Sequence, residues 1–271
     1  MKADPKTSAV YLYAIGRQAE LRKLLSGGAV PAALEDGTSV ALVTEGDLAA
    51  VVSEVPLSRF GEERFEQQLK SPAWAADKLM RHEKLAEYFS SKMCVVPLHF
   101  GVMYSTPERI REMLAARKER MIQILDRLNG REEWGLNIHA DRETLFEHMT
   151  ELSPKLAEMQ KRAKASSPGQ AYLLGRKLEG LKAAESKTEI KRVALEIRNA
   201  LAAESTDVKD LPVREHELKQ TPAVVGKLSF LVDRKKLKIF QKTAEKEAAQ
   251  FAGFGFGLEL TGPWPPYNFS E

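Results

Sequence analysis

The sequence contains a single cysteine, Cys94, and lacks long apolar runs. One thiol cannot form a disulfide within the chain, which excludes the small folds that depend on internal disulfides. No stretch approaches the roughly 20 apolar residues needed to span a bilayer. The first residues, Met1–Thr7, are polar and do not resemble a signal peptide. We therefore expect a cytoplasmic protein that meets any apolar phase through folded surfaces, without membrane insertion.

An excess of charge is also missing. The 41 basic residues nearly balance the 38 acidic ones, and the formal net charge is +3. Proteins held on nucleic acid by counterion release carry a stronger positive field, so nucleic acid is not an expected partner. A length of 271 residues with 43% hydrophobic content is enough for two modest cores.

The patterns that usually bind metals or perform catalysis are absent. No histidine stands at HxxxH spacing from another ligand, and there is no CxxC pair. His82 falls on the apolar face of an expected helix, where a structural hydrogen bond is the favoured role. Cys94 and His99 are close in sequence, but Cys94 enters an expected buried strand, where apolar surroundings keep a thiol protonated. We expect no catalytic residues, no cofactor and no metal.

A glycine run near the C-terminus resembles a nucleotide-binding loop only superficially. Gly253, Gly255 and Gly257 follow an expected helix and enter an expected strand. Loops that bind phosphate have the reverse order, because they follow a strand and open a helix. These glycines are better explained as a helix end at which another backbone or ring approaches closely.

The N-terminal half alternates strand and helix signals. Residues 10–15 favour a strand and 20–26 a helix, and two apolar runs around Glu45-Gly46-Asp47 predict a hairpin. Pro72 opens a helix whose expected packed face is Ala75, Leu79, His82, Leu85 and Phe89. A strand is expected over 95–103, then one helix from Ser105-Thr106-Pro107-Glu108 to Asn129-Gly130. The order β, α, β, β, α, β is the ferredoxin-like plan, with helices on one face of an antiparallel sheet.

The second half repeats this plan with an insertion. Strands are expected at 134–139, 212–217, 224–232 and 254–260, with helices at 142–152 and 234–249. Residues 153–205 form helices almost throughout and predict a long helical hairpin or coiled-coil arm. The predicted fold class is α+β: two tandem ferredoxin-like (βαββαβ) units, at 1–130 and 131–271, with the arm inserted in the second.

Two surfaces are candidates for partner binding. The arm carries a leucine stripe, Leu174, Leu178 and Leu181, expected to pack on the preceding helix around Leu156 and Met159, and a second stripe through Ile197 and Leu201. The second stripe is either free for docking or buried core. The tail after Gly262 combines three prolines with large aromatic side chains, and it either packs on its own domain or docks to a partner. The candidate partner-binding residues are Ile197, Leu201, Trp264, Tyr267 and Phe269.

Several segments, taken in order, resemble the GvpF/GvpL family of gas vesicle proteins. They run from about residue 8 to residue 269 and comprise Val10–Ile15, Gly46–Val55, His82-Glu83, Val96–Gly101, Glu133–Leu136, Pro168–Leu173 with Arg176-Lys177, and Gly262–Tyr267. One position departs from the family pattern, because His99 stands where that pattern has arginine after Pro-Leu.

The resemblance implies a non-catalytic accessory or minor structural protein that assists nucleation or assembly of the gas vesicle shell. Its implied partners are the small hydrophobic shell protein, GvpA, and other gas vesicle accessory proteins. Its implied location is the gas vesicle within the cytoplasm, on the gas-facing surface. Two other classes stay open on the residues alone: a small-molecule-using enzyme on a ferredoxin-like scaffold, and a generic scaffold whose arm pairs with partner helices.

Overall fold

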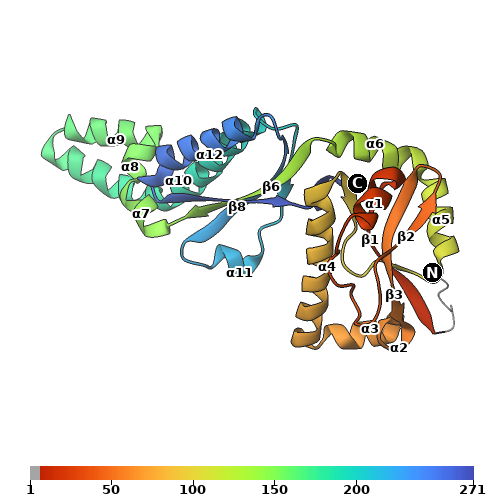
Figure 1. The fold of residues 1–271 in the computed structure, drawn as a ribbon. Coiled ribbons are helices and arrows are strands. Elements are labelled where there is room, and N and C mark those ends of the chain that lie inside the picture. Colours follow the sequence, from red (N-terminus) through yellow and green to blue (C-terminus); the bar gives the residue numbers. More distant parts are fainter. Residues whose placement is uncertain (1–6) are drawn as a thin grey trace. The chain divides into compact units, whose positions relative to one another are not determined.

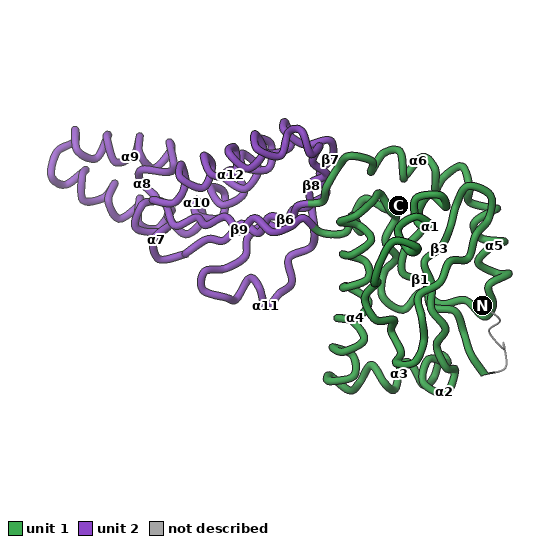
Figure 2. The backbone as a smooth tube through the Cα atoms, in the orientation of Figure 1, with its two compact units in different colours: residues 1–133, 264–271 green, residues 134–263 purple. Residues whose placement is uncertain are grey.

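The computed structural model describes residues 7–271 and has a mixed α+β fold with two antiparallel sheets (Figure 1). The chain divides into two compact units (Figure 2). Unit 1 runs to residue 133 and also includes residues 264–271, and unit 2 comprises residues 134–263. The expected division put the C-terminal tail in the second domain, and the structure instead assigns it to unit 1.

The sheet of unit 1 has the strand order β2-β3-β1-β4, and β5 also pairs with β1. Its strands are β1 (Ser8–Arg17), β2 (Ala41–Glu45), β3 (Leu48–Pro56), β4 (Val95–Pro97) and β5 (Met103–Tyr104). The predicted hairpin is confirmed, since β2 and β3 pair from Ala41↔Val52 to Glu45↔Leu48 around Gly46 and Asp47. Gly46 takes a φ of 53°, which a glycine adopts without strain.

Helices cover both faces of this sheet, whereas only one covered face was expected. The helices are α1 (Gln18–Ser26), α2 (Leu57–Phe60), α3 (Glu62–Leu69), α4 (Pro72–Lys92), α5 (Pro107–Ala116) and α6 (Lys118–Leu128). Along β1, Tyr11 and Tyr13 join the core beneath α1 and α4. The alternating residues Val10 and Leu12 are also fully buried, because α5 contacts β2, β3 and β5 and α6 contacts β4.

Three local expectations for unit 1 were wrong. The single helix predicted from 107 to 130 is divided at Arg117 into α5 and α6. On α4, Leu79 is exposed, and the buried face instead includes Lys78 and Ala86 together with the expected His82, Leu85 and Phe89. The strand predicted over 95–103 exists only as β4 and β5. Gly101 takes a φ of +96° between them, so residues 98–102 leave the strand path.

The sheet of unit 2 has the order β7-β8-β6-β9, the counterpart of the order in unit 1. Its strands are β6 (Arg131–Ala140), β7 (Asp207–Leu211), β8 (Ala223–Asp233) and β9 (Phe256–Trp264). The strand predicted at 212–217 was wrong. The strand ends at Leu211, which pairs with Lys227, and the Arg214 amide donates to the Glu217 side chain to begin α11 (Glu215–Leu218).

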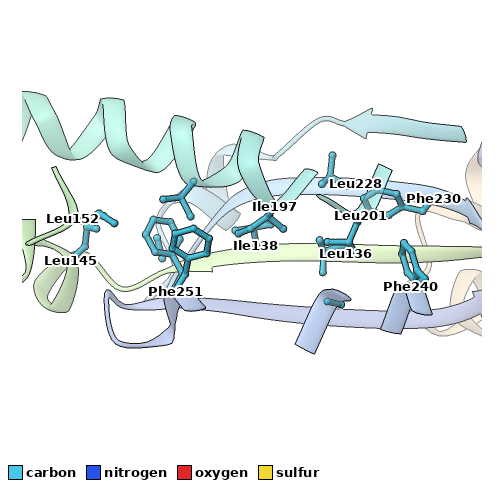
Figure 3. Packing of buried hydrophobic residues seen from close by; sticks show 14 of the residues in the cluster. Leu136, Ile138, Leu145, Leu152, Ile197, Leu201, Leu228, Phe230, Phe240 and Phe251 are labelled. Carbon is cyan, nitrogen blue, oxygen red and sulfur yellow. The ribbon is translucent and has the colours of Figure 1, made fainter. Parts of the chain in front are cut away.

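Helices α7 (Arg142–Glu147), α8 (Met149–Leu152), α9 (Pro154–Lys164), α10 (Pro168–Ala202) and α12 (Leu237–Ala252) complete unit 2. Helices α9 and α10 occupy most of the segment predicted as a helical arm, and they pack against each other after a break at residues 165–167. Leu156 and Leu178 are buried in one core cluster, as the leucine stripe predicted. Figure 3 shows this core, in which side chains of α10 lie against β6, β8 and α12.

Gly255 permits a close approach within unit 2. Its φ is +84°, and its carbonyl oxygen accepts a hydrogen bond of 2.8 Å from the Asp141 amide. A β-carbon at this position would lie 3.0 Å from the Asp141 carbonyl oxygen. The predicted close approach of a second backbone is therefore confirmed at Gly255.

Candidate functional site

The C-terminal tail is fastened to unit 1 by buried contacts. Its short 3-10 helix η1 (Tyr267–Phe269) places the Phe269 ring fully inside the unit. The Asn268 backbone amide donates to Oε2 of Glu133 over 3.0 Å, and its side-chain amide donates to Oε1 over 2.5 Å. Because the Glu133 carboxylate is only 3% exposed, these bonds satisfy a group that would be costly to bury alone.

Tyr267 connects the tail to a polar cluster around His82 in unit 1. Its hydroxyl donates to Oε2 of Glu83 over 3.2 Å and lies 3.3 Å from Nε2 of His82. The other ring nitrogen of His82, Nδ1, lies 2.9 Å from the Tyr11 hydroxyl. The Tyr267 ring stacks on His99, with ring centroids 5.3 Å apart and an angle of 19° between the planes. Residues from β1, α4, the loop after β4 and the tail thus meet at one place.

These contacts fit one assignment of protons. Tyr11 donates to Nδ1 of His82, the single remaining imidazole proton on Nε2 is left for the Tyr267 oxygen and the Leu98 backbone, and Tyr267 donates to Glu83. The Tyr11 oxygen in turn accepts from the Gly101 amide over 2.9 Å. Each donor then has an acceptor, which requires His82 to be neutral.

The electrostatics agree with a neutral His82. Burial lowers the pKa of this imidazole to about 4; a hydrogen bond to the Leu98 backbone opposes the shift, and the nearby His99 adds to it. Burial raises the pKa of the Glu83 carboxyl, and the hydrogen bond from Tyr267 partly offsets this. Burial and the adjacent Glu83 raise the pKa of the Tyr267 hydroxyl. His82 is therefore neutral and Tyr267 keeps its proton at neutral pH, and their contacts hold the tail on unit 1.

A cavity of about 590 Å³ with mixed polar and apolar walls lies beside this cluster, lined by residues of β1, β4, the loop after β4, α5, α6 and the residue between these helices. Leu12, Val96, Leu98, Val102, Met113 and Met121 supply most of its apolar walls. The cations Arg117 and Arg120 and the tail residues Ser270 and Glu271 complete its lining. Within residues 7–271, neither arginine side chain forms an ion pair.

The structure separates the five predicted partner-binding residues into two groups. Ile197 and Leu201 are fully buried in the core of unit 2 beside Ile138 and Leu136 (Figure 3), so the second stripe of the arm is not a free docking face. Apolar side chains from β6 and β8 cover it, which the sequence of α10 alone does not reveal. Of the tail residues, Phe269 is buried, Tyr267 is half-buried and Trp264 is 44% exposed.

The sequence-based reasoning missed Glu133 and Glu83 as partners of the tail. Glu133 and Glu83 lie 135 and 184 residues from Asn268 and Tyr267, so no local pattern connects them. Cys94 has a local explanation, since its thiol donates to the Leu125 carbonyl oxygen over 3.2 Å.

Residues 7–271 contain neither a cluster of metal ligands nor a membrane-spanning helix. No group of three or more His, Cys, Asp or Glu side chains is arranged to hold a metal ion. No helix in this range has the length and apolar character required to cross a membrane.

Comparison with known proteins identifies relatives along most of the chain. Gas vesicle protein L of Streptomyces sp. (strain CB03234) is 26% identical over 239 residues, covering 84% of this chain and 82% of the relative. Gas vesicle protein F of the same strain is 27% identical over 235 residues, covering 86% and 88%.

Two solved structures share the fold. The crystal structure of the gas vesicle protein GvpF from Anabaena sp. PCC7120 superposes with a TM-score of 0.64 at 18% identity, covering 97% of this chain and 96% of that one. GvpF from Microcystis aeruginosa gives a TM-score of 0.59 at 17% identity, covering 97% and 99%. The family model for the gas vesicle synthesis protein GvpL/GvpF matches residues 9–271, and the chain therefore belongs to the GvpL/GvpF family of gas vesicle proteins.

Proposed function

We propose that this protein is a non-catalytic accessory protein of gas vesicle assembly that binds the small hydrophobic shell protein GvpA and assists nucleation or growth of the shell. The observation that carries the proposal is the family match, which extends over residues 9–271 and so includes both units and the tail. Other gas vesicle accessory proteins are further partners. The site of action is the gas vesicle, on the gas-facing side of its shell.

The cavity of unit 1 is the surface that we propose meets the shell protein. Its volume of about 590 Å³ lies within the usual range for pockets that bury a ligand, and Leu98, Val102 and Met113 offer apolar contact to an entering segment. A shell subunit that is apolar and prone to aggregation would gain by placing such side chains there, since burial of apolar area drives association. Arg117 and Arg120 at the cavity provide donors for carbonyl or carboxylate groups beside that segment.

We also propose a fold class for the two units. Both sheets follow the order second-third-first-fourth strand, and each unit has the connection β, α, β, β, α, β once additional helices, such as the short α11 between β7 and β8, are set aside. We infer that the units are tandem ferredoxin-like domains and that α9 and α10 form an arm inserted in the second. This order and connection support the classification.

The test is co-purification and light scattering of the purified shell protein with and without this chain. We expect a recoverable complex and slower growth of scattered light. The variant Leu98→Gln/Met113→Gln places polar amides in the cavity and should weaken binding about tenfold or more. Leu195→Gln is the matched control, because Leu195 is 55% exposed on α10 and distant in sequence from the cavity. Equal aggregation in both samples, with no complex recovered, would refute the proposal.

A further inference from the structure

The turn between α9 and α10 is strongly basic. Residues 161–177, called here the hairpin tip, contain the five cations Lys161, Arg162, Lys164, Arg176 and Lys177 and no aspartate or glutamate. Arg162 pairs with Glu158 over 3.0 Å. The other four side chains form no ion pair with any residue in 7–271. The hairpin tip is therefore a local positive patch on a protein that is nearly neutral as a whole.

The same segment exposes large apolar side chains. Tyr172 is 66% exposed and Leu173 is 67% exposed, the two highest values among the exposed large hydrophobic residues of 7–271. On α10, Tyr172 and Leu173 stand four residues before Arg176 and Lys177, so all four side chains lie on one helix face. Adjacent aromatic, aliphatic and cationic groups are typical of a surface that another protein covers.

A surface with the opposite charge is present on α3 of unit 1. Glu62, Glu63 and Glu66 are exposed and form no ion pair within residues 7–271. Their spacing puts them on one face of the helix together with Leu69, which is 41% exposed, and with the exposed Lys70 that follows the helix, so the carboxylates still outnumber the cation on this face. This acidic face thus presents carboxylates beside an apolar side chain, as the hairpin tip presents cations beside Tyr172 and Leu173.

From this complementarity we propose that the hairpin tip binds the α3 face of a second copy of this chain. The cations of one copy pair with the carboxylates of the next, and Tyr172 and Leu173 cover Leu69. Because the two faces differ, one copy can bind one neighbour through its tip and another through its α3 face. Association therefore increases as concentration rises. This contact is separate from the cavity proposed to bind the shell protein.

Sedimentation velocity of the full chain over a range of concentrations tests the proposal. We expect the average sedimentation coefficient to rise steadily with concentration at low ionic strength and to fall at 1 M salt, where the Debye length is only about 3 Å. Arg176→Glu/Lys177→Glu and, separately, Glu62→Lys/Glu66→Lys should each lower the association constant about tenfold or more. An equimolar mixture of the two variants should associate again, because one supplies a native tip and the other a native α3 face.

Lys187→Glu/Lys191→Glu is the matched control, with the same charge change at exposed positions farther along α10. It should associate like the unmodified chain, and circular dichroism should show every variant to be folded. A chain that stays monomeric at all concentrations overturns the proposal, as does a mixture of folded variants that fails to associate. Binding of the tip to vesicles containing phosphatidylserine, without self-association, also overturns it and assigns the patch to an anionic lipid surface.

Discussion

Replacing Phe269 with alanine tests how firmly the tail holds to unit 1. A phenylalanine buries roughly 150 to 250 Å², and at about 25 cal/mol per Å² this corresponds to about 4 to 6 kcal/mol for complete burial. The alanine retains the β-carbon, so the expected loss is about 3 to 5 kcal/mol if the tail stays in place. The Phe269 side chain has no exposed surface, which justifies the full range.

The measured loss has an upper limit set by the tail itself. If docking of residues 264–271 contributes less than this amount, the variant tail detaches and only the docking free energy is lost from the stability of the chain. Hydrogen exchange at the Asn268 amide separates the two cases, because that amide donates to Glu133 only while the tail is docked. Its protection should fall by roughly two to three and a half powers of ten, at about 1.4 kcal/mol for each factor of ten.

The assay combines urea unfolding of the full chain with exchange at this one amide. Trp264→Ala is the control, since this tail residue is also aromatic but is 44% exposed, and it should cost much less. The reasoning is refuted if Phe269→Ala unfolds within about 0.5 kcal/mol of the unmodified chain and the Asn268 amide keeps its protection.

Three further outcomes are expected. Ile197→Ser should lower the free energy of unfolding by about 2 to 5 kcal/mol in urea titrations, while Leu195→Ser, two residues away and exposed, should change it little; equal losses would contradict the burial of α10. The pKa of His82 is about 4 in the folded state against 6.5 in the unfolded state, so the unfolded chain binds its proton first as pH falls and this contribution to stability is lost between pH 6.5 and 4. At about 1.4 kcal/mol per pKa unit, the difference in free energy of unfolding between the unmodified chain and His82→Gln should change by about 3 kcal/mol over that pH window. Thermal or urea unfolding measures this difference, and parallel stability profiles of the two chains would show that the His82 pKa is not shifted. Gly255→Ala should lower the free energy of unfolding by about 1 to 3 kcal/mol or more, because of the φ of +84° and the contact with the Asp141 backbone. Gly253→Ala should be neutral or stabilising, because Gly253 has helical backbone angles and nothing lies near the added carbon. An unchanged stability of Gly255→Ala would contradict the close approach.

Local patterns predicted the parts of the fold that short segments determine. The hairpin around Gly46 and the start of α4 at Pro72 were predicted correctly, because turn residues and a proline in the first helical turn act within a few positions. The long strand predicted around Leu98 was wrong, because its alternation of apolar residues outweighed the one glycine that interrupts it. The path of a strand through Gly101 depends on a backbone angle that composition does not report.

The candidate site was less accessible to prediction than the fold. The sequence identified Tyr267 and Phe269 as residues that must pack or bind, since such rings are costly to leave in water. It did not identify the partners of the tail, because His82, which contacts Tyr267, and Glu133, which accepts from the neighbouring Asn268, are buried residues of remote elements. Ile197 was ambiguous for a related reason: an apolar stripe has the same period whether a sheet of the same chain or another protein covers it.

The assignment of the tail to unit 1 has a consequence for synthesis. Residues 264–271 are translated only after all of unit 2, and at about 5 to 20 residues per second the ribosome needs roughly 7 to 26 s to pass from residue 133 to residue 264. During that interval Glu133 lacks the amides of Asn268, and His82 lacks the hydroxyl of Tyr267. The binding site for the tail on the nascent first unit is therefore empty during this interval. The lining of the adjacent cavity is completed by Ser270 only after the tail has been synthesised and has docked.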